Sequence, residues 1–279
     1  MSLNEFEFQV AGIKLHGQYY SPQLVKAVVL LVHGLGEHSK RYERTVVPFL
    51  TKNSIAVISF DQFGHGNTKG KRGHHPGYSF LLDAIDQMIS KAGKLFPEQP
   101  IFLYGHSMGG NIAINYCLQR NNSIKGLIAT SPFLRLAFKP PAWKMTLAGI
   151  LDKIMPSITL PSDLDVNAIS RDKSEIVAYE LDPLVHDRVS TGYSLEIMKQ
   201  GEWAIEHAPE MKIPMLLMHG TNDRLTSHLA SEEFASKASD TVEIVLFKGG
   251  FHELHHDLEK EKMLEKIRRW IESQIQNSK

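Results

Sequence analysis

The feature that most constrains this chain is the segment 105–109, which reads Gly-His-Ser-Met-Gly and directly follows the apolar run 101–104. A G-x-S-x-G pattern at the end of a strand predicts a sharp turn into a helix, with Ser107 on the turn and its hydroxyl exposed. Gly105 and Gly109 are expected for a steric reason, because side chains there would collide with the neighbouring helix and strand. The pentapeptide is common by chance, so its interpretation depends on partner residues elsewhere in the chain.

Two later loops carry the partners that a serine of this kind needs. Asp223 lies in the turn that follows the apolar run 213–219. His252 lies in the loop that follows the run 242–247. A serine hydroxyl is a poor nucleophile at neutral pH, so His252 would take its proton, while Asp223 would fix the imidazole tautomer and stabilise the imidazolium. The chain order Ser, acid, His is the order expected for a triad of Ser107, Asp223 and His252 on an α/β-hydrolase sheet.

These residues also have structural alternatives. Ser107 is a small residue that suits a helix start, and Asp223 suits the N-cap of a helix beginning near Leu225. Asp61 is a rival acid, because it follows the predicted strand 55–60. It precedes Ser107, however, and this is the wrong chain order for the fold.

The segment 252–256 also matches H-E-x-x-H, the signature of zinc metalloproteases. That motif binds zinc when both histidines lie one turn apart on the same face of a helix. Here it follows a strand and the pair Gly249-Gly250, so we expect His252 to lie in a loop. Asp257 or Glu259 would supply a third ligand only at an unfamiliar spacing. We therefore expect neither a metal nor an organic cofactor.

Acyl-transfer chemistry at Ser107 requires N–H donors for an oxyanion. One donor is the N–H of the residue after the nucleophile, Met108. The second should come from the loop after 27–32, a nearly continuous apolar run that is typical of a strand covered on both faces. That loop begins with His33-Gly34, and the N–H of Leu35 is the best candidate.

Together these segments resemble the monoacylglycerol lipase and lysophospholipase branch of the serine α/β-hydrolases. The resemblance covers essentially the whole chain. Its most specific part is the stretch 36–42, since the pentapeptide around Ser107 is shared with many unrelated esterases. The matching segments are 33–42, 61–66, 105–110, 131–132, 219–223 and 252–255.

The resemblance implies a role for further residues. In such lipases a Glu and an Arg of the 36–42 stretch, and the His three residues after the catalytic one, line the pocket for the glycerol group. These correspond to Glu37, Arg41 and His255, and a Tyr of the inserted segment corresponds to Tyr179. The structural alternatives are a helix-capping Glu37, a surface ion pair for Arg41 and a solvated His255.

The hydrophobic periodicity predicts an α/β fold. Residues 5–10 and 14–20 alternate polar and apolar on either side of Ala11-Gly12, which indicates an antiparallel hairpin at the sheet edge. Strands and helices then alternate, which favours a mostly parallel eight-stranded sheet flanked by helices. The further predicted strands are 27–32, 55–60, 101–104, 124–129, 213–219 and 242–247, and the predicted helices are near 42–52, 79–95, 108–119, near 226–238 and 258–275.

This alternation stops after residue 135 and resumes at 207. We therefore expect 1–135 and 207–279 to form one discontinuous core domain and 136–206 to form a mainly helical cap over the carboxyl ends of the strands. The cap contains a short, almost entirely apolar helix between Pro140-Pro141 and Pro156. Two interpretations of this helix stay open: it packs on the core, or it is an exposed lid that contacts lipid surfaces and gates an apolar tunnel. A second cap helix over 194–205 would either line the pocket or only form the hydrophobic face of the cap.

Composition limits the remaining function classes. The 31 Lys and Arg residues balance 31 Asp and Glu residues, so nothing suggests a nucleic-acid partner. Cys117 is the single cysteine, which favours a reducing compartment. The N-terminus lacks the pattern of a signal peptide, and no apolar run reaches the ~20 residues of a membrane span. We expect a cytoplasmic protein, with at most transient membrane-surface contact through the cap; the sequence does not predict its oligomeric state.

The sequence thus predicts a serine hydrolase that cleaves monoacylglycerols through an acyl-enzyme at Ser107, with the substrate class implied by the resemblance. A lysophospholipid or a medium-chain ester is the nearest alternative substrate, and peptidase activity is a further alternative. A catalytically inactive lipid-binding protein would keep the same fold. A dehalogenase or epoxide hydrolase on this fold would carry Asp in place of Ser107.

Overall fold

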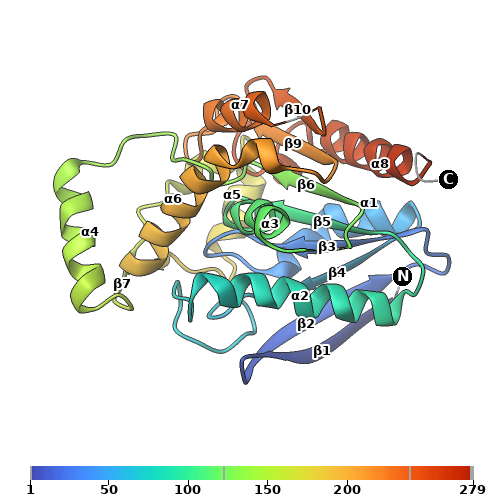
Figure 1. The fold of residues 1–279 in the computed structure, drawn as a ribbon, viewed down its shortest axis with the longest axis horizontal. Coiled ribbons are helices and arrows are strands. Elements are labelled where there is room, and N and C mark those ends of the chain that lie inside the picture. Colours follow the sequence, from blue (N-terminus) through green and yellow to red (C-terminus); the bar gives the residue numbers. More distant parts are fainter. Residues whose placement is uncertain (1, 122, 239, 277–279) are drawn as a thin grey trace.

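The centre of the molecule is an eight-stranded sheet (Figure 1). The computed structural model describes residues 2–121, 123–238 and 240–276. Strand β2 pairs antiparallel with both β1 and β4, and the other neighbouring strands are parallel, which confirms the predicted mostly parallel sheet with an edge hairpin. Across the sheet the strands are β1 (Ser2–Val10), β2 (Ile13–Ser21), β4 (Ile55–Phe60), β3 (Ala27–Val32), β5 (Ile101–His106), β6 (Gly126–Thr130), β9 (Met215–Gly220) and β10 (Val242–Phe247).

The burial of each strand follows its place in the sheet. Every residue of β3, β4, β5, β6 and β9 is buried. Strands covered on both faces in this way are apolar along their whole length. Edge strand β1 is largely exposed, and its turn to β2 places Ala11 at φ 47° and Gly12 at φ 80°. Such positive φ values give a two-residue hairpin turn the twist of the strands that it joins.

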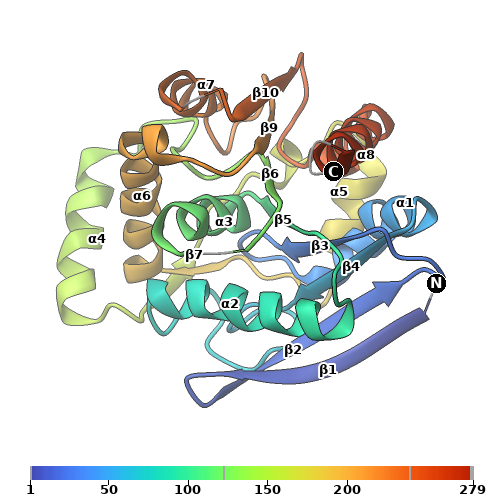
Figure 2. The same ribbon diagram turned by 45° about the vertical axis from the view of Figure 1, so that its right-hand side comes forward.

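Helices cover both faces of the sheet (Figures 1 and 2). Helices α1 (Val46–Lys52) and α8 (Lys260–Gln276) pack on one face. Helices α2 (Tyr78–Leu95), α3 (Met108–Gln119) and α7 (His228–Lys237) pack on the other.

The helix predicted near 42–52 is divided in two. A 3₁₀ turn covers Ser39–Arg44, Thr45 interrupts it at φ −137°, and α1 then begins at Val46. Pro48 lies in the first turn of α1, where a missing N–H needs no partner, and this favours a new helix start at that point.

A long segment is inserted between β6 and β9. It contains α4 (Ala142–Ile154), β7 (Thr159–Pro161), α5 (Lys173–Glu180), β8 (Arg188–Ser190) and α6 (Thr191–Glu206). The two apolar helices expected there are present as α4 and α6. Helix α5 and the short antiparallel pair β7–β8 were not predicted, because three-residue strands and a helix of low amphipathicity leave little periodic signal.

Helix α6 is fixed to α3 by a row of amide side chains. Asn111 donates from Nδ2 to the carbonyl of Ile197 at 3.1 Å. Asn115, one turn later on α3, donates to the carbonyl of Gln200 at 3.1 Å, and Gln119 donates to the Gln200 side chain at 3.1 Å. These bonds hold one wall of the insertion against the helix that follows Ser107.

Helix α4 stands apart from the sheet, beyond α6 (Figures 1 and 2). None of its residues is buried, so the interpretation that it packs on the core is wrong. Four large apolar side chains at helical spacing form an exposed stripe: Trp143, Leu147, Ile150 and Ile154, which are 65%, 46%, 51% and 69% exposed. Among the described helices, none combines the length and the apolar composition needed to cross a bilayer.

Truncating a side chain in the core should lower the free energy of unfolding far more than truncating one on the surface. Leu264 on α8 is 4% exposed and belongs to the core, whereas Leu229 on α7 is 65% exposed. We expect Leu264→Ala to lower the free energy of unfolding by about 2–5 kcal/mol, since it removes buried methyl groups and leaves a cavity. Leu229→Ala should change it by about 0.5 kcal/mol or less. Chemical denaturation of both variants checks this; equal effects would contradict the assigned core.

Candidate active site

Ser107 occupies a strained turn between β5 and α3. Its backbone has φ 53° and ψ −118°, a conformation that residues with a side chain rarely adopt. A Cβ added at Gly105 would lie 2.4 Å from the carbonyl oxygen of Gly109, and one at Gly109 would lie 2.1 Å from that of Val32. The structure thus confirms the steric reason predicted for both glycines, against the helix in one case and the strand in the other.

The three predicted triad residues meet at the carboxyl ends of the strands. His252 Nε2 lies 2.9 Å from Ser107 Oγ, and His252 Nδ1 lies 2.7 Å from Asp223 Oδ2. Asp223 and His252 are buried, while Ser107 is partly exposed. This arrangement allows the Ser107 hydroxyl to donate its hydrogen to His252 as the oxygen attacks an electrophile.

The structural alternatives for the acid are resolved by its neighbours. Helix α7 is capped by the Ser227 side chain, so Asp223 is not the N-cap of that helix. Asp61 accepts hydrogen bonds from the N–H of Ser39 at 2.9 Å and of Asn67 at 2.8 Å, so it organises loops on its own side of the site.

The charges of the site are set by two opposing effects. Burial disfavours the imidazolium of His252, but the adjacent Asp223 carboxylate outweighs it, so the pKa of His252 is raised above its ordinary value of 6.5. Burial also disfavours the Asp223 carboxylate, yet His252 and His219 hold its pKa well below 3.8. Asp223 is therefore ionised at neutral pH.

Two backbone amides point to an oxyanion site. Leu35 and Met108 both line the same cavity as Ser107. Within the described part of the chain, neither N–H donates to another group. Gly34, by contrast, donates to Glu37 Oε1 at 2.6 Å, which fixes the loop that carries Leu35. Free donors beside a nucleophile are what a developing oxyanion requires.

The H-E-x-x-H segment does not form the helix of a metalloprotease. Residues Leu254–His256 make a 3₁₀ turn, and both ring nitrogens of His252 are engaged by Asp223 and Ser107. Glu253, His255 and His256 do bring ligand atoms within 4.8 Å of one another. However, Arg41 donates to both carboxylate oxygens of Glu253, at 2.5 and 2.8 Å, so a guanidinium cation already pairs with the carboxylate that a metal would need.

The residues implied for the glycerol pocket are divided between its wall and the layer behind. Glu37 and Tyr179 line the cavity, whereas Arg41 and His255 do not. Arg41 is 6% exposed, binds Glu37 Oε2 at 3.0 Å and lies 4.6 Å from the centre of the Tyr179 ring. His255 is fully buried and stacks on Tyr42 at 4.7 Å. A surface ion pair and a solvated histidine are therefore both wrong as alternatives, and neither side chain reaches the cavity.

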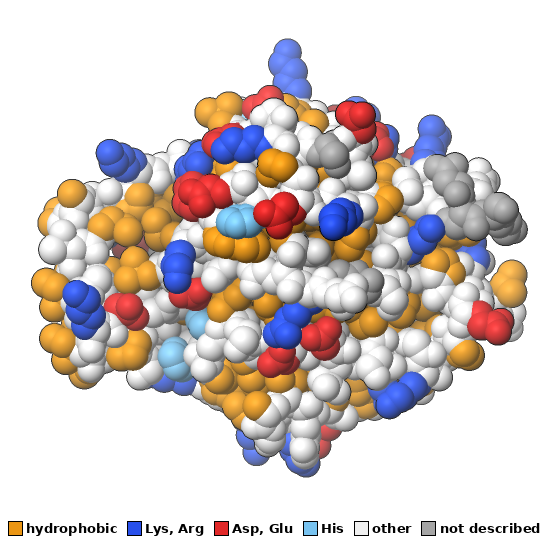
Figure 3. Space-filling view, viewed as in Figure 1, with side chains coloured by type: hydrophobic (Ala, Val, Ile, Leu, Met, Phe, Trp, Pro, Cys, Tyr) orange, Lys and Arg blue, Asp and Glu red, His pale blue; other side chains and the backbone are white. Residues whose placement is uncertain are grey.

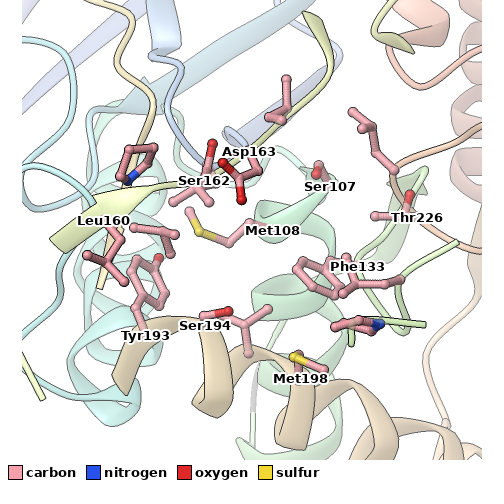
Figure 4. A pocket seen from close by; sticks show the side chains of 18 of the residues that line it. Ser107, Met108, Phe133, Leu160, Ser162, Asp163, Tyr193, Ser194, Met198 and Thr226 are labelled. Atoms are coloured by element: carbon pink, nitrogen blue, oxygen red, sulfur yellow. The ribbon is translucent and has the colours of Figure 1, made fainter. Parts of the chain in front are cut away.

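The cavity itself is large and mostly apolar. It has a volume of about 620 Å³ and runs from Ser107 toward the inserted segment. Figure 4 shows Ser107, Met108, Phe133, Leu160 and Met198 among the side chains that line this space. Helix α4 contributes the half-buried Met145, Ala148 and Leu151, and its exposed Trp143, Lys144 and Leu147 also border the cavity.

Two further residues contact the site, and the sequence analysis assigned neither of them a role there. Glu253 lines the cavity and binds Arg41, and it lies directly beside His252 in the chain. His219 reaches Asp223, and it lies four residues before it in the stretch 219–223. Their roles depend on side-chain contacts that spacing alone does not indicate.

The raised pKa of His252 predicts the pH dependence of Ser107. Only neutral His252 can accept a proton, so reactivity should rise with pH and reach half its maximum above pH 6.5. The rate at which a fluorophosphonate labels Ser107, measured between pH 5 and 9, checks this. In Asp223→Asn the stabilising carboxylate is absent, so the midpoint should fall and the maximal rate should drop by orders of magnitude. A wild-type midpoint below 6.5 would contradict the assigned pair.

Comparisons with known proteins provide independent evidence on the family of this chain. The sequence model of the family described as "Serine aminopeptidase, S33" matches residues 23–259. The chain is 31% identical over 271 residues to the monoglyceride lipase of Rattus norvegicus, covering 95% of this chain and 88% of that protein. It is 36% identical over 256 residues to an uncharacterized abhydrolase domain-containing protein of Dictyostelium discoideum, covering 91% of this chain but only 27% of that longer protein.

A solved structure agrees with these relatives. The crystal structure of a monoacylglycerol lipase from Paleococcus ferrophilus has a TM-score of 0.86 and 34% sequence identity, covering 93% of this chain and 99% of that one. The matched region includes the turn at Ser107 and the loops of Asp223 and His252. The chain therefore belongs to the serine aminopeptidase S33 family of α/β-hydrolases, as a relative of the monoglyceride lipases.

Proposed function

We propose that this protein hydrolyses the ester bond of monoacylglycerols and releases a fatty acid and glycerol. The observation that carries this proposal is the position of Ser107 and His252 at one end of a long, mostly apolar cavity of about 620 Å³. Such a space suits an acyl chain, and the relatives named as monoglyceride lipases support the same substrate class. Glu37 and Tyr179 give the cavity a polar wall for the glycerol hydroxyls.

The proposed reaction proceeds through an acyl-enzyme. Ser107 Oγ attacks the ester carbonyl carbon while His252 takes the hydroxyl proton, and the N–H groups of Leu35 and Met108 hold the negative oxygen. The tetrahedral intermediate collapses as His252 passes its proton to the leaving glycerol oxygen. Water then attacks the acyl-enzyme with His252 as base, and the fatty acid leaves while Ser107 regains its proton. This sequence of steps uses no metal and no organic cofactor.

Arg41 and His255 take part from behind the wall in this proposal. Arg41 holds the carboxylates of Glu37 and Glu253, and both residues line the cavity. The position of Glu37 and Glu253 sets how the polar wall is presented to a glycerol group. The side chains of Arg41 and His255 remain buried. The contribution of Arg41 and His255 to substrate binding is thus indirect.

The segment 136–206 acts as a cap in this proposal, and α4 as its lipid-contacting part. Hydrophobic side chains gather over α4, beside a hollow in the surface (Figure 3). Ile150 and Ile154 of the exposed stripe do not line the cavity, whereas Trp143 and Leu147 are exposed and also border it. An apolar helix of this kind binds the surface of a bilayer, where monoacylglycerols reside. The cytoplasmic location remains a prediction of the sequence.

A direct assay tests the substrate class. Purified protein should release glycerol and oleate from 1-monooleoylglycerol, and Ser107→Ala should reduce this release by at least about 10³-fold, because it removes the nucleophile. EDTA should leave the activity unchanged. Oleoyl-lysophosphatidylcholine, p-nitrophenyl butyrate and an aminoacyl p-nitroanilide run in parallel separate the alternatives. Turnover of only one of these three would keep the Ser107 chemistry and exclude the monoacylglycerol assignment.

A second experiment tests α4 as a membrane contact. We expect wild-type protein to float with phosphatidylcholine vesicles, and the double variant Ile150→Ser/Ile154→Ser to bind at least about ten-fold more weakly, since it loses apolar area from the stripe. Val177→Ser/Leu181→Ser is the matched control, because Val177 on α5 and Leu181 directly after that helix are 51% and 77% exposed and are also four residues apart. Equal losses in both double variants, or no flotation of the wild type, would rule out α4 as the contact.

A further inference from the structure

The Asp223 carboxylate has more hydrogen-bond donors than a triad requires. Its Oδ1 accepts from the N–H groups of Leu225 and Thr226, at 2.8 and 3.0 Å. Its Oδ2 accepts from His252 Nδ1 at 2.7 Å, from Thr226 Oγ1 at 2.9 Å and from His219 Nε2 at 3.1 Å. His219 differs from the other donors, because it belongs to β9 and neither to the turn of Asp223 nor to the triad.

The partners of His219 fix which ring nitrogen carries the hydrogen. Nε2 lies 3.1 Å from Asp223 Oδ2 and 3.2 Å from the carbonyl oxygen of Thr226, and neither oxygen has a hydrogen to donate. Nε2 is therefore the donor. Nδ1 lies 2.8 Å from the hydroxyl of Ser231 on α7, which donates to it when the ring is neutral. Both His219 and Ser231 are 0% exposed, so bulk water does not compete for these bonds.

We propose that His219 is a positioning residue for the triad, which orients the Asp223 carboxylate toward His252 and limits the basicity of His252. This inference rests on the proposed function of the triad. His219 does not line the cavity, so it acts through Asp223 and not on a substrate. A donor other than His252 at Oδ2 draws negative charge from that oxygen and weakens its stabilisation of the His252 imidazolium. The same bond restricts rotation of the carboxylate.

Other titratable groups face this pair from several elements. His106 of β5 lies against His252 with ring centres 4.9 Å apart, and the charges of Glu37 and Glu253 favour the His252 imidazolium. His228 of α7 lies 6.4 Å from the His219 ring. All of these groups remain in each variant below, so a difference among the variants reports on the His219–Asp223 bond.

The test compares His219→Leu with His219→Gln. Leu removes the donor, whereas the Gln amide keeps an N–H near the position of Nε2. Without the donor, Asp223 holds the His252 imidazolium more strongly, so the pKa of His252 rises further. We expect the midpoint of fluorophosphonate labelling of Ser107 to move up by about 0.5 pH unit and the maximal rate to fall about 3- to 10-fold. His219→Gln should keep the wild-type midpoint within about 0.2 unit and most of the rate.

A second readout and a second variant keep the test independent of folding and of the substrate. NMR titration of His252 in the full ¹⁵N-histidine-labelled chain gives its midpoint without any reaction at Ser107, so a failure of the proposed ester hydrolysis is recognised separately. Ser231→Ala removes only a hydroxyl, frees the His219 tautomer and should shift the midpoint in the same direction by a smaller amount. An unmoved midpoint in both His219→Leu and Ser231→Ala, or equal rate losses in the Leu and Gln variants, would overturn the proposal.

Discussion

The close approach of α3 to the end of β3 is the contact on which the rest of the site depends. No side chain fits at Gly109, where a Cβ would lie 2.1 Å from the carbonyl oxygen of Val32. This contact places the first turn of α3 against the sheet, and Ser107, directly before that turn, has φ 53°. A strained residue of this kind costs about 1–3 kcal/mol, which the fully buried strands around it offset. In return, the Met108 N–H is brought beside the loop that carries Leu35.

Behind the cavity, one buried cation joins the loop of Leu35 to the loop of His252. Arg41 bonds to Glu37, which accepts from the Gly34 N–H in the loop of Leu35. It also bonds to Glu253, the residue after His252. Burial disfavours the charge on Arg41, but Glu253 and Glu37 outweigh this and raise its pKa above its ordinary value. Buried charges of this kind are stable only when every partner is present, so the loop of Leu35 and the loop of His252 are held together as one unit.

The sequence allowed the prediction of elements whose pattern is local. Strands such as β3 and β4 are continuous apolar runs. Ser107, Asp223 and His252 follow the predicted strands β5, β9 and β10 in the expected chain order. Prediction failed where the signal was short or ambiguous: Thr45 divides one expected helix, β7 and β8 carry too few residues for a periodic pattern, and α5 has little amphipathicity. The apolar composition of α4 fitted both a buried and an exposed helix, since composition does not say which neighbours are available.

The sequence by itself determined the sheet, the sharp turn at Ser107 and the set of residues that a triad needs, because each depends on the order of types along a few neighbouring residues. Only the tertiary structure decided the environment of those residues. It placed Arg41 and His255 behind the cavity wall and not on it, and it brought His219 to the carboxylate of Asp223. Burial, ionisation and hydrogen-bond partners arise from segments that are distant in the chain, and no local pattern encodes which side chains will meet.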